Sequence, residues 1–468
     1  MVTSILLIVV SMQVIALPSM CDVTFDSYKV GDGKWNREGK FFTSQCLYDG
    51  GDCCKDELLS KGFDVDLVGN GFCNGGVYSY ACDNDEAGDC TRAACDLKLA
   101  ETGKGTYSIV VKDVRNGDGF PDIIIGNYGE SNQLLLNKGD GTFNDPAVLP
   151  EGLTSTYSIA VKDINGNAWP DIVIGNNGDT NQSLMNKGNG TFKDQAIDLP
   201  GGDMLDTRSI VIADINGDGW PDIIVGNDSE HDESGRNQIM LNDGTGTFPE
   251  AQDSPLDAGI YTNSIVVEDV NGDGGPDIIL GTRWGKNQIL MNTDNGSFDE
   301  PVDLPGGRMV TDVIAVNDVN GDGAKDLVVE NSKDKSNQLL INNGDGTFQE
   351  PVILPGGDSN THSIIIADID NDDRADIVIG NDGQNADQVL INNGDGAFES
   401  SIDLPCSHYM FTGDIAVADM NNDGYPDIII GNDGQKNQLL INLGNGISFT
   451  EPNVKDSQLG VKLGPICG

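Results

Sequence analysis

Residues 214–226 read DINGDGWPDIIVG, and closely related stretches occur seven times along the chain. The closing Asp of each copy falls at positions 122, 171, 222, 277, 326, 376 and 427, so the repeat is 49 to 55 residues long. Each copy is followed by a run like NQLLIN, a turn like NGDGTF and an extended segment like QEPVILP. A regular period of this length is typical of architectures in which each repeat is one supersecondary unit.

Each unit is predicted to hold four short strands. In the third unit we expect the first three at 209–214, 222–226 and 237–241, with the fourth after a hairpin turn. The first two are apolar at nearly every position, whereas a strand with one exposed face would alternate. A sheet covered on both faces fits a blade packed between two neighbours. We therefore expect an all-β, seven-bladed β-propeller over residues 96–456, with an open solenoid as the structural alternative.

Closing such a ring requires the first and last units to join. Residues 96–111 resemble the junctions between other units and would supply an outer strand to the last blade. Residues 446–456 would serve equally well, so the sequence leaves both closures open.

The acidic stretch is not an EF-hand loop, because position 12 is Val225 where that motif needs a bidentate carboxylate, and strands replace the flanking helices. Oxygen-bearing side chains at positions 1, 3, 5 and 9, with a carbonyl at position 7, nevertheless suit Ca²⁺ better than Zn²⁺ or Cu²⁺. A plain Asn-Gly or Asp-Gly turn is the alternative for any single copy. Seven copies in phase favour calcium, since unpaired carboxylates would repel one another.

The candidate calcium ligands follow loop by loop. They are Asp113, Asn116, Asp118 and Asp122; Asp163, Asn165, Asn167 and Asp171; Asp214, Asn216, Asp218 and Asp222; Asp269, Asn271, Asp273 and Asp277; Asp318, Asn320, Asp322 and Asp326; Asp368, Asp370, Asp372 and Asp376; and Asp419, Asn421, Asp423 and Asp427.

Two loops depart from the pattern in a way that weakens them. The first has one extra residue, which displaces Asp113 and puts Val114 at the expected first position. The second has Asn167 at position 5, which lowers its charge. We expect these two sites to be weak or empty. The sixth loop is the most acidic, with Asp370, Asp372 and Asp373.

The units resemble FG-GAP and VCBS-type repeats, the family that builds the seven-bladed, calcium-binding propeller of integrin α chains. The resemblance covers about residues 96–456 and rests on the seven phased motifs. It implies a fold more specifically than a function, since propellers of this family serve in adhesion, in sugar binding and as accessory domains of enzymes.

Residues 1–20 hold an apolar stretch from Ile5 to Leu17 that is short for a membrane span and ends near small residues. We expect a cleaved secretory signal peptide and hence an extracellular protein; an uncleaved membrane anchor is the alternative. Four N-x-S/T sequons fit a secreted chain, at Asn181, Asn189, Asn227 and Asn295.

Eight of the ten cysteines lie between Cys21 and Cys95, and only Cys406 and Cys467 follow. An even number behind a signal peptide indicates disulfides. The segments CLYDGGDCC (46–54) and GNGFCNGGVYSYACDNDEAGDC (69–90) resemble the Notch-type repeat, a small disulfide and calcium module. The resemblance makes residues 21–95 a cysteine-rich module, with or without metal, and residues 457–468 a tail. Its implied calcium ligands are Asp49, Asp52, Asp85 and Asp89.

The net charge of −48 would repel nucleic acid and anionic membranes and attract cations. The three histidines are not repeated in phase, and no motif of a nucleophilic or metal-dependent enzyme occurs. We therefore predict a non-catalytic, calcium-binding propeller in extracellular adhesion or recognition. A carbohydrate-binding lectin is the first alternative, and a polysaccharide-processing enzyme is the second.

A binding end follows from the up-and-down topology of a blade. The calcium loops and the NGDGTF-like turns share one end of the ring, and the other loops share the opposite end. We expect that opposite end to bind a protein or glycan, with ordinary loop variation as the alternative. Its candidate residues are Tyr128, His231, Arg236, Arg283, Trp284, His408, Tyr409 and Phe411.

Overall fold

The computed structural model describes residues 105–450 apart from 115–116, 194, 202–205, 229–235, 254–260, 295, 332–335, 357–359, 384, 395, 399, 406, 445 and 447. The predicted signal peptide, the cysteine-rich module with Asp49, Asp52, Asp85 and Asp89, and the tail lie outside the described residues. Within these residues all helix or strand structure is strand.

The strands form one eight-stranded sheet, five four-stranded sheets and a two-stranded hairpin. The eight-stranded sheet contains β1 (Thr106–Lys112), β2 (Asp122–Glu130), β3 (Gln133–Leu135), β4 (Ala147–Val148), β5 (Thr154–Lys162), β6 (Asp171–Asn176), β7 (Gln182–Leu184) and β8 (Ile197–Asp198).

The next two sheets contain β9 (Thr207–Ala213), β10 (Asp222–Asn227), β11 (Gln238–Met240) and β12 (Gln252–Asp253), and then β13 (Thr262–Glu268), β14 (Asp277–Thr282), β15 (Lys286–Leu290) and β18 (Val302–Arg308). The two-stranded hairpin is β16 (Asn292–Asp294) with β17 (Ser297–Phe298).

The last three sheets contain β19 (Ile314–Asn317), β20 (Asp326–Val329), β21 (Gln338–Leu340) and β22 (Val352–Ile353); β23 (Thr361–Ala367), β24 (Asp376–Asn381), β25 (Gln388–Leu390) and β26 (Ser401–Asp403); and β27 (Thr412–Ala418), β28 (Asp427–Asn432), β29 (Gln438–Asn442) and β30 (Phe449–Thr450).

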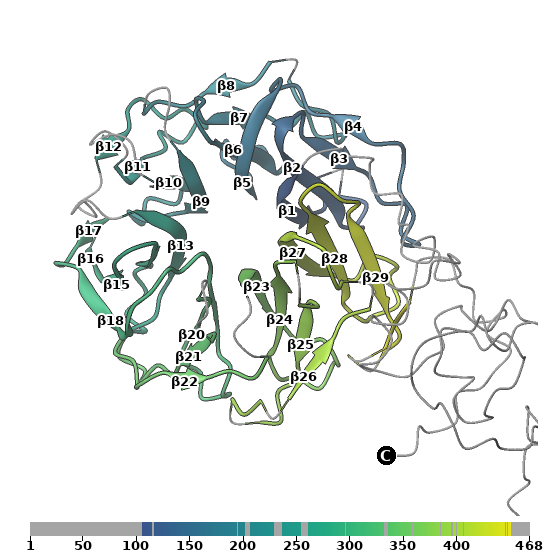
Figure 1. The fold of residues 1–468 in the computed structure, drawn as a ribbon. Coiled ribbons are helices and arrows are strands. Elements are labelled where there is room, and N and C mark those ends of the chain that lie inside the picture. The colour runs from purple at the N-terminus through teal and green to yellow at the C-terminus, as the bar shows by residue number, and fades with distance from the viewer. Residues whose placement is uncertain are drawn as a thin grey trace, which may run out of the picture. The chain divides into compact units, whose positions relative to one another are not determined.

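The same antiparallel four-strand unit recurs along the chain, and the units stand around a common axis with their first strands innermost (Figure 1). The predicted strand order and the propeller-like arrangement are confirmed. The eight-stranded sheet contains two such units, β1–β4 and β5–β8, joined because Tyr128 and Glu130 of β2 pair with Ser155 and Thr154 of β5. The count of seven separate blades stays a prediction.

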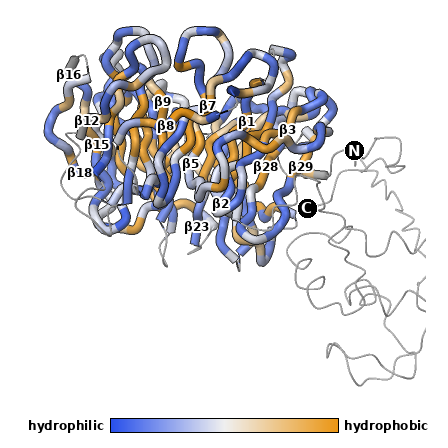
Figure 2. Tube along the Cα trace, turned by 90° about the horizontal axis from the view of Figure 1, so that it is seen from above, coloured by the Kyte–Doolittle hydropathy of each residue, from blue (hydrophilic) through white to orange (hydrophobic). Residues whose placement is uncertain are grey.

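The core lies between neighbouring units rather than within one. The second strand of each unit is buried along almost its whole length, as in β10, and its side chains face both neighbours. Ile223 and Val225 pack toward the preceding unit, whereas Ile224 packs toward the following one. Apolar strands therefore form the middle layer of the ring, and hydrophilic loops cover its two ends (Figure 2). This explains why these strands do not alternate in hydropathy.

The first and last units are in contact, so the open-solenoid alternative is wrong. Ile109 and Ile123 of the first unit share one core cluster with Met420 and Ile429 of the last. Of the two closures that the sequence allowed, the described residues show the second, since Phe449 and Thr450 of β30 pair with β29.

Buried polar pairs join successive units, and we call each such junction a seam. At one seam, Asn337 before β21 accepts a hydrogen bond from the backbone N–H of Asn331 at 3.1 Å and donates from Nδ2 to Thr361 Oγ1 of the next unit at 3.0 Å. We call this pair the Asn–Thr clasp. It is repeated at the other seams by Asn132 with Thr156, Asn181 with Thr207, Asn237 with Thr262, Asn287 with Thr311 and Asn437 with Thr106, while Asp387 accepts from Thr412.

Candidate metal centre

The acidic loops connect the first and second strands of each unit and fold around their first Asp. In the third loop, Asp214 accepts hydrogen bonds from the N–H of Asp218 at 3.1 Å and from the N–H of Gly219 at 2.8 Å. Asp218 in turn accepts from the N–H of Trp220 at 2.8 Å. Gly219 has a φ of 91°, a left-handed conformation that glycine adopts without strain. These bonds wrap the backbone of positions 5 and 6 around the Asp214 carboxylate.

The closing Asp of each loop is fully buried and held on both oxygens. Asp222 accepts from the N–H of Ile215 at 3.1 Å through Oδ2 and from the N–H of Asn242 at 2.8 Å through Oδ1. All seven closing residues have this pattern, which fixes the loop to the end of the third strand. Burial raises the pKa of Asp376 to about 6 and that of Asp427 to about 7, because desolvation opposes a negative charge without a cationic partner.

The first loop corrects a prediction. Asp113 is not displaced from position 1, because it accepts from the N–H of Gly119 at 2.9 Å just as Asp214 accepts from Gly219. Val114 therefore occupies position 2, where it is buried in the core and donates its N–H to Asp122. With Val114 at position 2, the sequence alignment puts the extra residue after it, and Asn116 lies outside the described residues.

In the second loop, side chains form hydrogen bonds with other groups of the same loop. Asn165 donates from Nδ2 to Asp171 Oδ2 at 2.7 Å, and Asn167 accepts from the N–H of Trp169 at 2.8 Å. Ala168 adopts a φ of 71° where most other loops have glycine. This amide N–H occupies an oxygen of the closing carboxylate that a cation would otherwise use, and the weak second site stays a prediction.

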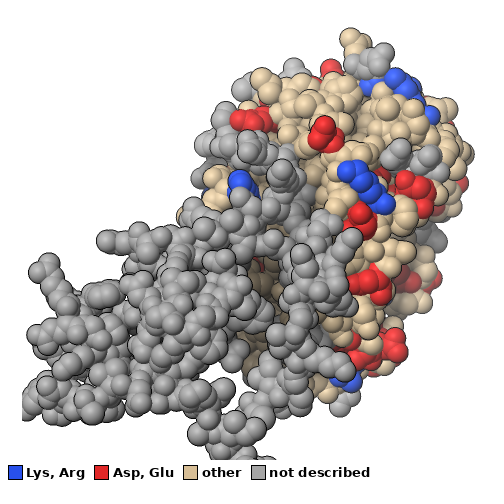
Figure 3. All heavy atoms as spheres, turned by 90° about the vertical axis from the view of Figure 1, so that its right-hand side faces the viewer, with Lys and Arg blue, Asp and Glu red and all other residues tan. Residues whose placement is uncertain are grey.

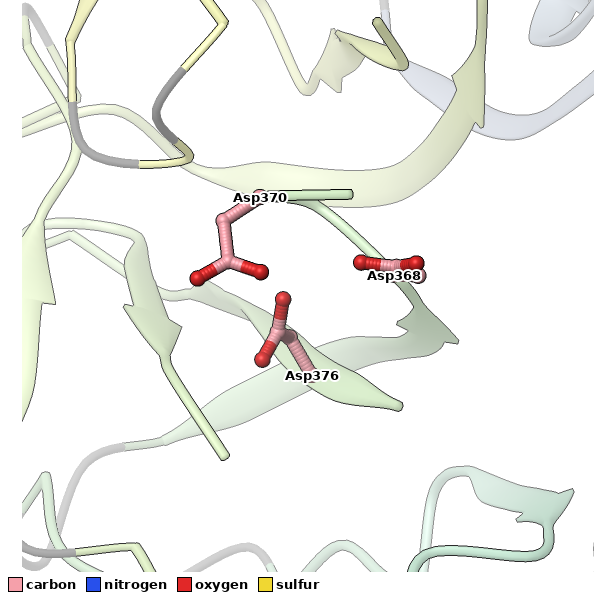
Figure 4. A group of neighbouring side chains, drawn as sticks. All are labelled: Asp368, Asp370 and Asp376. Atoms are coloured by element: carbon pink, nitrogen blue, oxygen red, sulfur yellow. The ribbon is translucent and has the colours of Figure 1, made fainter. Parts of the chain in front are cut away.

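The sixth loop brings three carboxylates together. One oxygen of each of Asp368, Asp370 and Asp376 lies within 4.8 Å of the others (Figure 4). Asp370 stands where four other loops have an Asn that donates to the Asp at position 5, and its Oδ1 is buried without a hydrogen-bond partner. Burial and the neighbouring Asp372 and Asp368 raise the pKa of Asp370. Arg374 pairs with Asp372, so one member of this loop already has a cationic partner.

This donor set fits a hard divalent cation. The carboxylates of Asp368, Asp370 and Asp376 supply oxygen ligands only, and the unpartnered Oδ1 of Asp370 is the atom that such an ion would satisfy. In the third, fourth, fifth and seventh loops the Asn at position 3 donates from Nδ2 to the Asp at position 5, and the backbone N–H of position 5 donates to the Asp at position 1. Among the described residues, three carboxylates come together in the sixth loop alone.

A ring of asparagines that we did not predict connects the loops. Asn242, at the end of the third strand, donates from Nδ2 to the carbonyl of Pro221 in its own loop and to the carbonyl of Ile164 in the preceding loop, at 2.9 and 2.8 Å. The equivalents are Asn137, Asn186, Asn292, Asn342, Asn392 and Asn442. The signal was present, since the last letter of each NQLLIN-like run is an in-phase Asn.

The hairpin turns lie at the same end as the acidic loops, as predicted. A Cβ added to Gly244 of the third turn would meet the Trp220 ring at 2.8 Å, and one added to Gly246 would meet Asn165 of the preceding loop at 3.0 Å. These glycines are required because the loop side chains pack directly on them.

The opposite end exposes aromatic side chains. The exposed fractions are 42% for Tyr128, 50% for Trp284, 48% for Tyr409 and 50% for Phe411. Arg283 pairs with Asp228 at 2.8 Å and stacks over Trp284, and His408 lies beside Tyr409. Arg236 lies at this end as well, next to residues 229–235 with His231, which are outside the described part.

Further residues at this end escaped the prediction. The rings of Tyr107, Tyr157 and Tyr128 form a cluster with centroids 4.8 to 5.8 Å apart, and Arg208 lies 4.3 Å over the ring of Tyr157. His362 stands between two carboxylates, Asp312 and Asp382. Tyr107, Tyr157, Arg208 and His362 each occupy the variable position between an in-phase Thr and Ser at the start of a first strand, which is the signal that could have revealed them.

The family assignment follows from these repeats. The model of the FG-GAP-like repeat matches residues 115–174, 163–225, 219–280, 269–329, 318–379 and 374–430. The chain belongs to the FG-GAP-like repeat family. Each match runs from one acidic loop into the second strand of the following unit, so the family model recognises the repeated loop-and-strand pattern of this FG-GAP protein. A search of curated proteins finds no match.

Several solved structures match this chain. A Burkholderia pseudomallei lectin, BP39L, is 11% identical over 75% of this chain and 99% of its own, with a TM-score of 0.58. The BBS1N structure in complex with ARL6DN is 13% identical over 76% and 95%, with a TM-score of 0.50. An Agrocybe aegerita lectin, solved for its recognition of non-reducing terminal N-acetylglucosamine, is 23% identical over 64% and 80%, with a TM-score of 0.48. At these identities the first two share the fold alone with this chain, and the third, with a TM-score below 0.5, supports no statement about fold or function.

No helix among the described residues is long and apolar enough to cross a membrane.

Proposed function

We propose that this chain is a secreted, calcium-stabilised propeller of seven blades that acts in extracellular adhesion or recognition without catalysis. The count of seven is supported by the eight-stranded sheet, because β1–β4 and β5–β8 each have a full set of four strands. One core cluster also packs Ile124 and Leu134 of the first set against Ile159 and Ile172 of the second, as between separate sheets. The signal peptide and the Notch-like module are part of this proposal.

Calcium is the cofactor that the loops support best, and the observation that carries it is the buried, unpartnered Oδ1 of Asp370 beside Asp368 and Asp376. A bound cation would neutralise carboxylates that otherwise repel one another, and ligand binding to the folded state raises its stability. We expect the melting midpoint to fall when a chelator replaces calcium. An unchanged midpoint would contradict the calcium proposal.

Recognition is assigned to the end opposite the acidic loops. There Trp284, Tyr409 and Phe411 are about half exposed, and the tyrosine cluster lies near Arg208. Exposed aromatic and Arg side chains are typical of binding surfaces. On the side of the molecule seen in Figure 3, the part that the described residues form shows Asp and Glu side chains interspersed with Lys and Arg.

A carbohydrate ligand is the second candidate, and the observation that favours it is the pairing of exposed aromatic rings with polar groups. Arg283 lies over Trp284, and His408 lies beside Tyr409. Rings of this kind can stack on sugars while neighbouring polar groups bind hydroxyls.

A screen on the calcium-loaded protein tests both candidates. Glycan arrays and extracellular protein libraries should give hits that Trp284→Ala or Tyr409→Ala abolishes. Trp220→Ala is the matched control, since Trp220 is also exposed but lies at the loop end. Hits that depend on Trp220 and not on Trp284 would move the binding surface to the loop end. Turnover in a polysaccharide substrate screen would favour the enzyme alternative.

A further inference from the structure

The sequon asparagines of the described residues differ in exposure and in the hydrogen bonds of their side chains. Asn189 lies in the hairpin turn of the second unit and is exposed. Its Oδ1 accepts hydrogen bonds from the backbone N–H and from the hydroxyl of Thr191. No described residue accepts a hydrogen bond from its Nδ2, the atom to which an N-glycan is attached. A glycan on this nitrogen would therefore displace no hydrogen bond to a described residue.

Asn181 is in the opposite situation. It is 4% exposed and forms an Asn–Thr clasp, with Nδ2 donating to Thr207 Oγ1 at 3.0 Å and Oδ1 accepting from the N–H of Asn176 at 2.9 Å. A glycan on Nδ2 would have to occupy the seam between the second and third units. The seam has no room for a sugar, because the residues on both sides are buried.

Asn227 is also fixed inside the ring. It is fully buried, its Nδ2 donates to the carbonyl of Arg236, and its Oδ1 accepts from Thr207 Oγ1 at 2.9 Å. A sugar on this nitrogen is incompatible with the folded unit. Chains glycosylated there or at Asn181 would fail to close this seam, whereas chains glycosylated at Asn189 would fold unhindered.

We propose that, among the three sequons in the described residues, Asn189 is the N-glycan acceptor of the folded protein and that Asn181 and Asn227 stay unmodified. The proposal rests on the secretion proposed above. It places the glycan at the end that carries the acidic loops, so the opposite end, with Trp284 and Tyr409, remains free for a ligand.

The chain offers a matched variant for the test. The equivalent turn of the first unit has Asp140, whose Oδ1 accepts from the N–H and hydroxyl of Thr142 at 3.0 and 2.5 Å. Asn189→Asp therefore keeps the turn and removes the acceptor nitrogen. Asn295 is outside the described residues, so all variants are made in an Asn295→Gln background, which leaves three sequons.

The full chain is expressed in eukaryotic cells with its own N-terminus and, in parallel, behind an added cleavable signal. Peptide mapping after enzymatic deglycosylation should find one glycan, at Asn189, and none in Asn189→Asp. Folded, secreted protein with Asn189 unmodified, or with glycan on Asn181 or Asn227, would overturn the proposal. A chain that is glycosylated at Asn189 only behind the added signal supports this acceptor and instead contradicts the proposed secretion.

Discussion

Asn437 donates a hydrogen bond from Nδ2 to Thr106 Oγ1 at 3.1 Å, although 331 positions separate the two residues. Its Oδ1 accepts from the N–H of Asn432 at 2.8 Å, as in the clasps between consecutive units. The ring is thus closed by the same buried contact that joins its neighbouring units.

This contact predicts a cost for Asn437→Ala. The change leaves the buried N–H of Asn432 without its acceptor and takes one of two hydrogen bonds from the Thr106 hydroxyl, which still donates to Asn127. This should lower the free energy of unfolding by about 1–3 kcal/mol. Denaturant unfolding measures the loss, with Asn337→Ala as the matched variant at an internal seam. A loss at Asn337 but none at Asn437 would show that the closing seam is not formed in solution.

Asp387→Asn should stabilise the protein above neutral pH. Burial raises the pKa of Asp387 to about 7, from an ordinary 3.8, so the folded state holds a proton that the unfolded state releases between those values. Stability therefore falls as pH rises through this window, and the full penalty is present above pH 7. Asn at this position, as at the other seams, removes the penalty. At ~1.4 kcal/mol per pKa unit, we expect a gain of about 1–3 kcal/mol at pH 8 and little at pH 4.

The control for that experiment is Asp140→Asn, in an exposed turn where the next unit has Asn189. Both variants are made in a host without N-glycosylation, because Asp140→Asn creates an Asn-Gly-Thr sequon. The hydroxyl of Thr142 lowers the pKa of Asp140, so its contribution is lost in acid rather than in base. A stabilisation at pH 8 shared by both variants would show that general charge reduction, and not the burial of Asp387, is the cause.

Asp370→Asn should have opposite effects with and without calcium. In chelator the change removes a carboxylate that is crowded by Asp368 and Asp372, so the midpoint should stay or rise. In excess calcium the variant lacks one anionic ligand, so it should gain less than the wild type, by about 2–4 °C. Asn421→Asp in the seventh loop is the mirror variant and should gain more. Equal calcium responses in all three proteins would remove the sixth loop from the proposed sites.

The calcium response should also depend on pH. The raised pKa values of Asp376 (about 6) and Asp427 (about 7) mean that these groups are protonated in acid, where they cannot bind a cation. Above their pKa they carry an unfavourable buried charge that calcium would offset. We expect the calcium-induced shift of the midpoint to be large at pH 8 and small at pH 5. A shift that does not change between these values would indicate that the closing carboxylates are not involved.

Gly431→Ala should destabilise the ring at its closing seam. A Cβ at this position would lie 2.7 Å from Ile109 Cδ1 and 2.7 Å from Thr106 Cγ2 of the first unit, so one side must move. Overpacking of this kind costs about 1–3 kcal/mol, which thermal or denaturant unfolding resolves. Gly275→Ala is the control, because its Cβ meets nothing closer than 3.2 Å and the fifth unit has Ala324 there.

Much of the fold could be predicted because the repeat supplies the same information many times. Continuous apolar runs such as DIIVG imply strands covered on both faces, and β10 is such a strand. The closing strand could not be chosen, because two segments carry similar patterns and only pairing distinguishes them. Asp113 was misplaced because a one-residue insertion can be aligned on either side of Val114, and only the burial of Val114 decides.

The candidate sites were predictable to a lesser degree. Residues of one loop, such as Asp214 and Asp218, are close in sequence, so the sequence could group them and the structure shows a hydrogen bond between them. The Asn–Thr clasps and the tyrosine cluster join residues of different units. In-phase residues such as the Thr and Ser around Tyr107 mark these positions in the sequence but do not show which of them meet. Asp387 shows the same limit, since its raised pKa arises from burial at a seam that sequence alone does not place.

Because the seams are equivalent, the ring does not depend on which junction lacks a backbone connection. Between Thr450 and Gly105 the ring is held by a core cluster and an Asn–Thr clasp, just as where the backbone is continuous. A ring of residues 105–450 that is cut at another junction, with Thr450 linked to Gly105, would thus keep the same contacts.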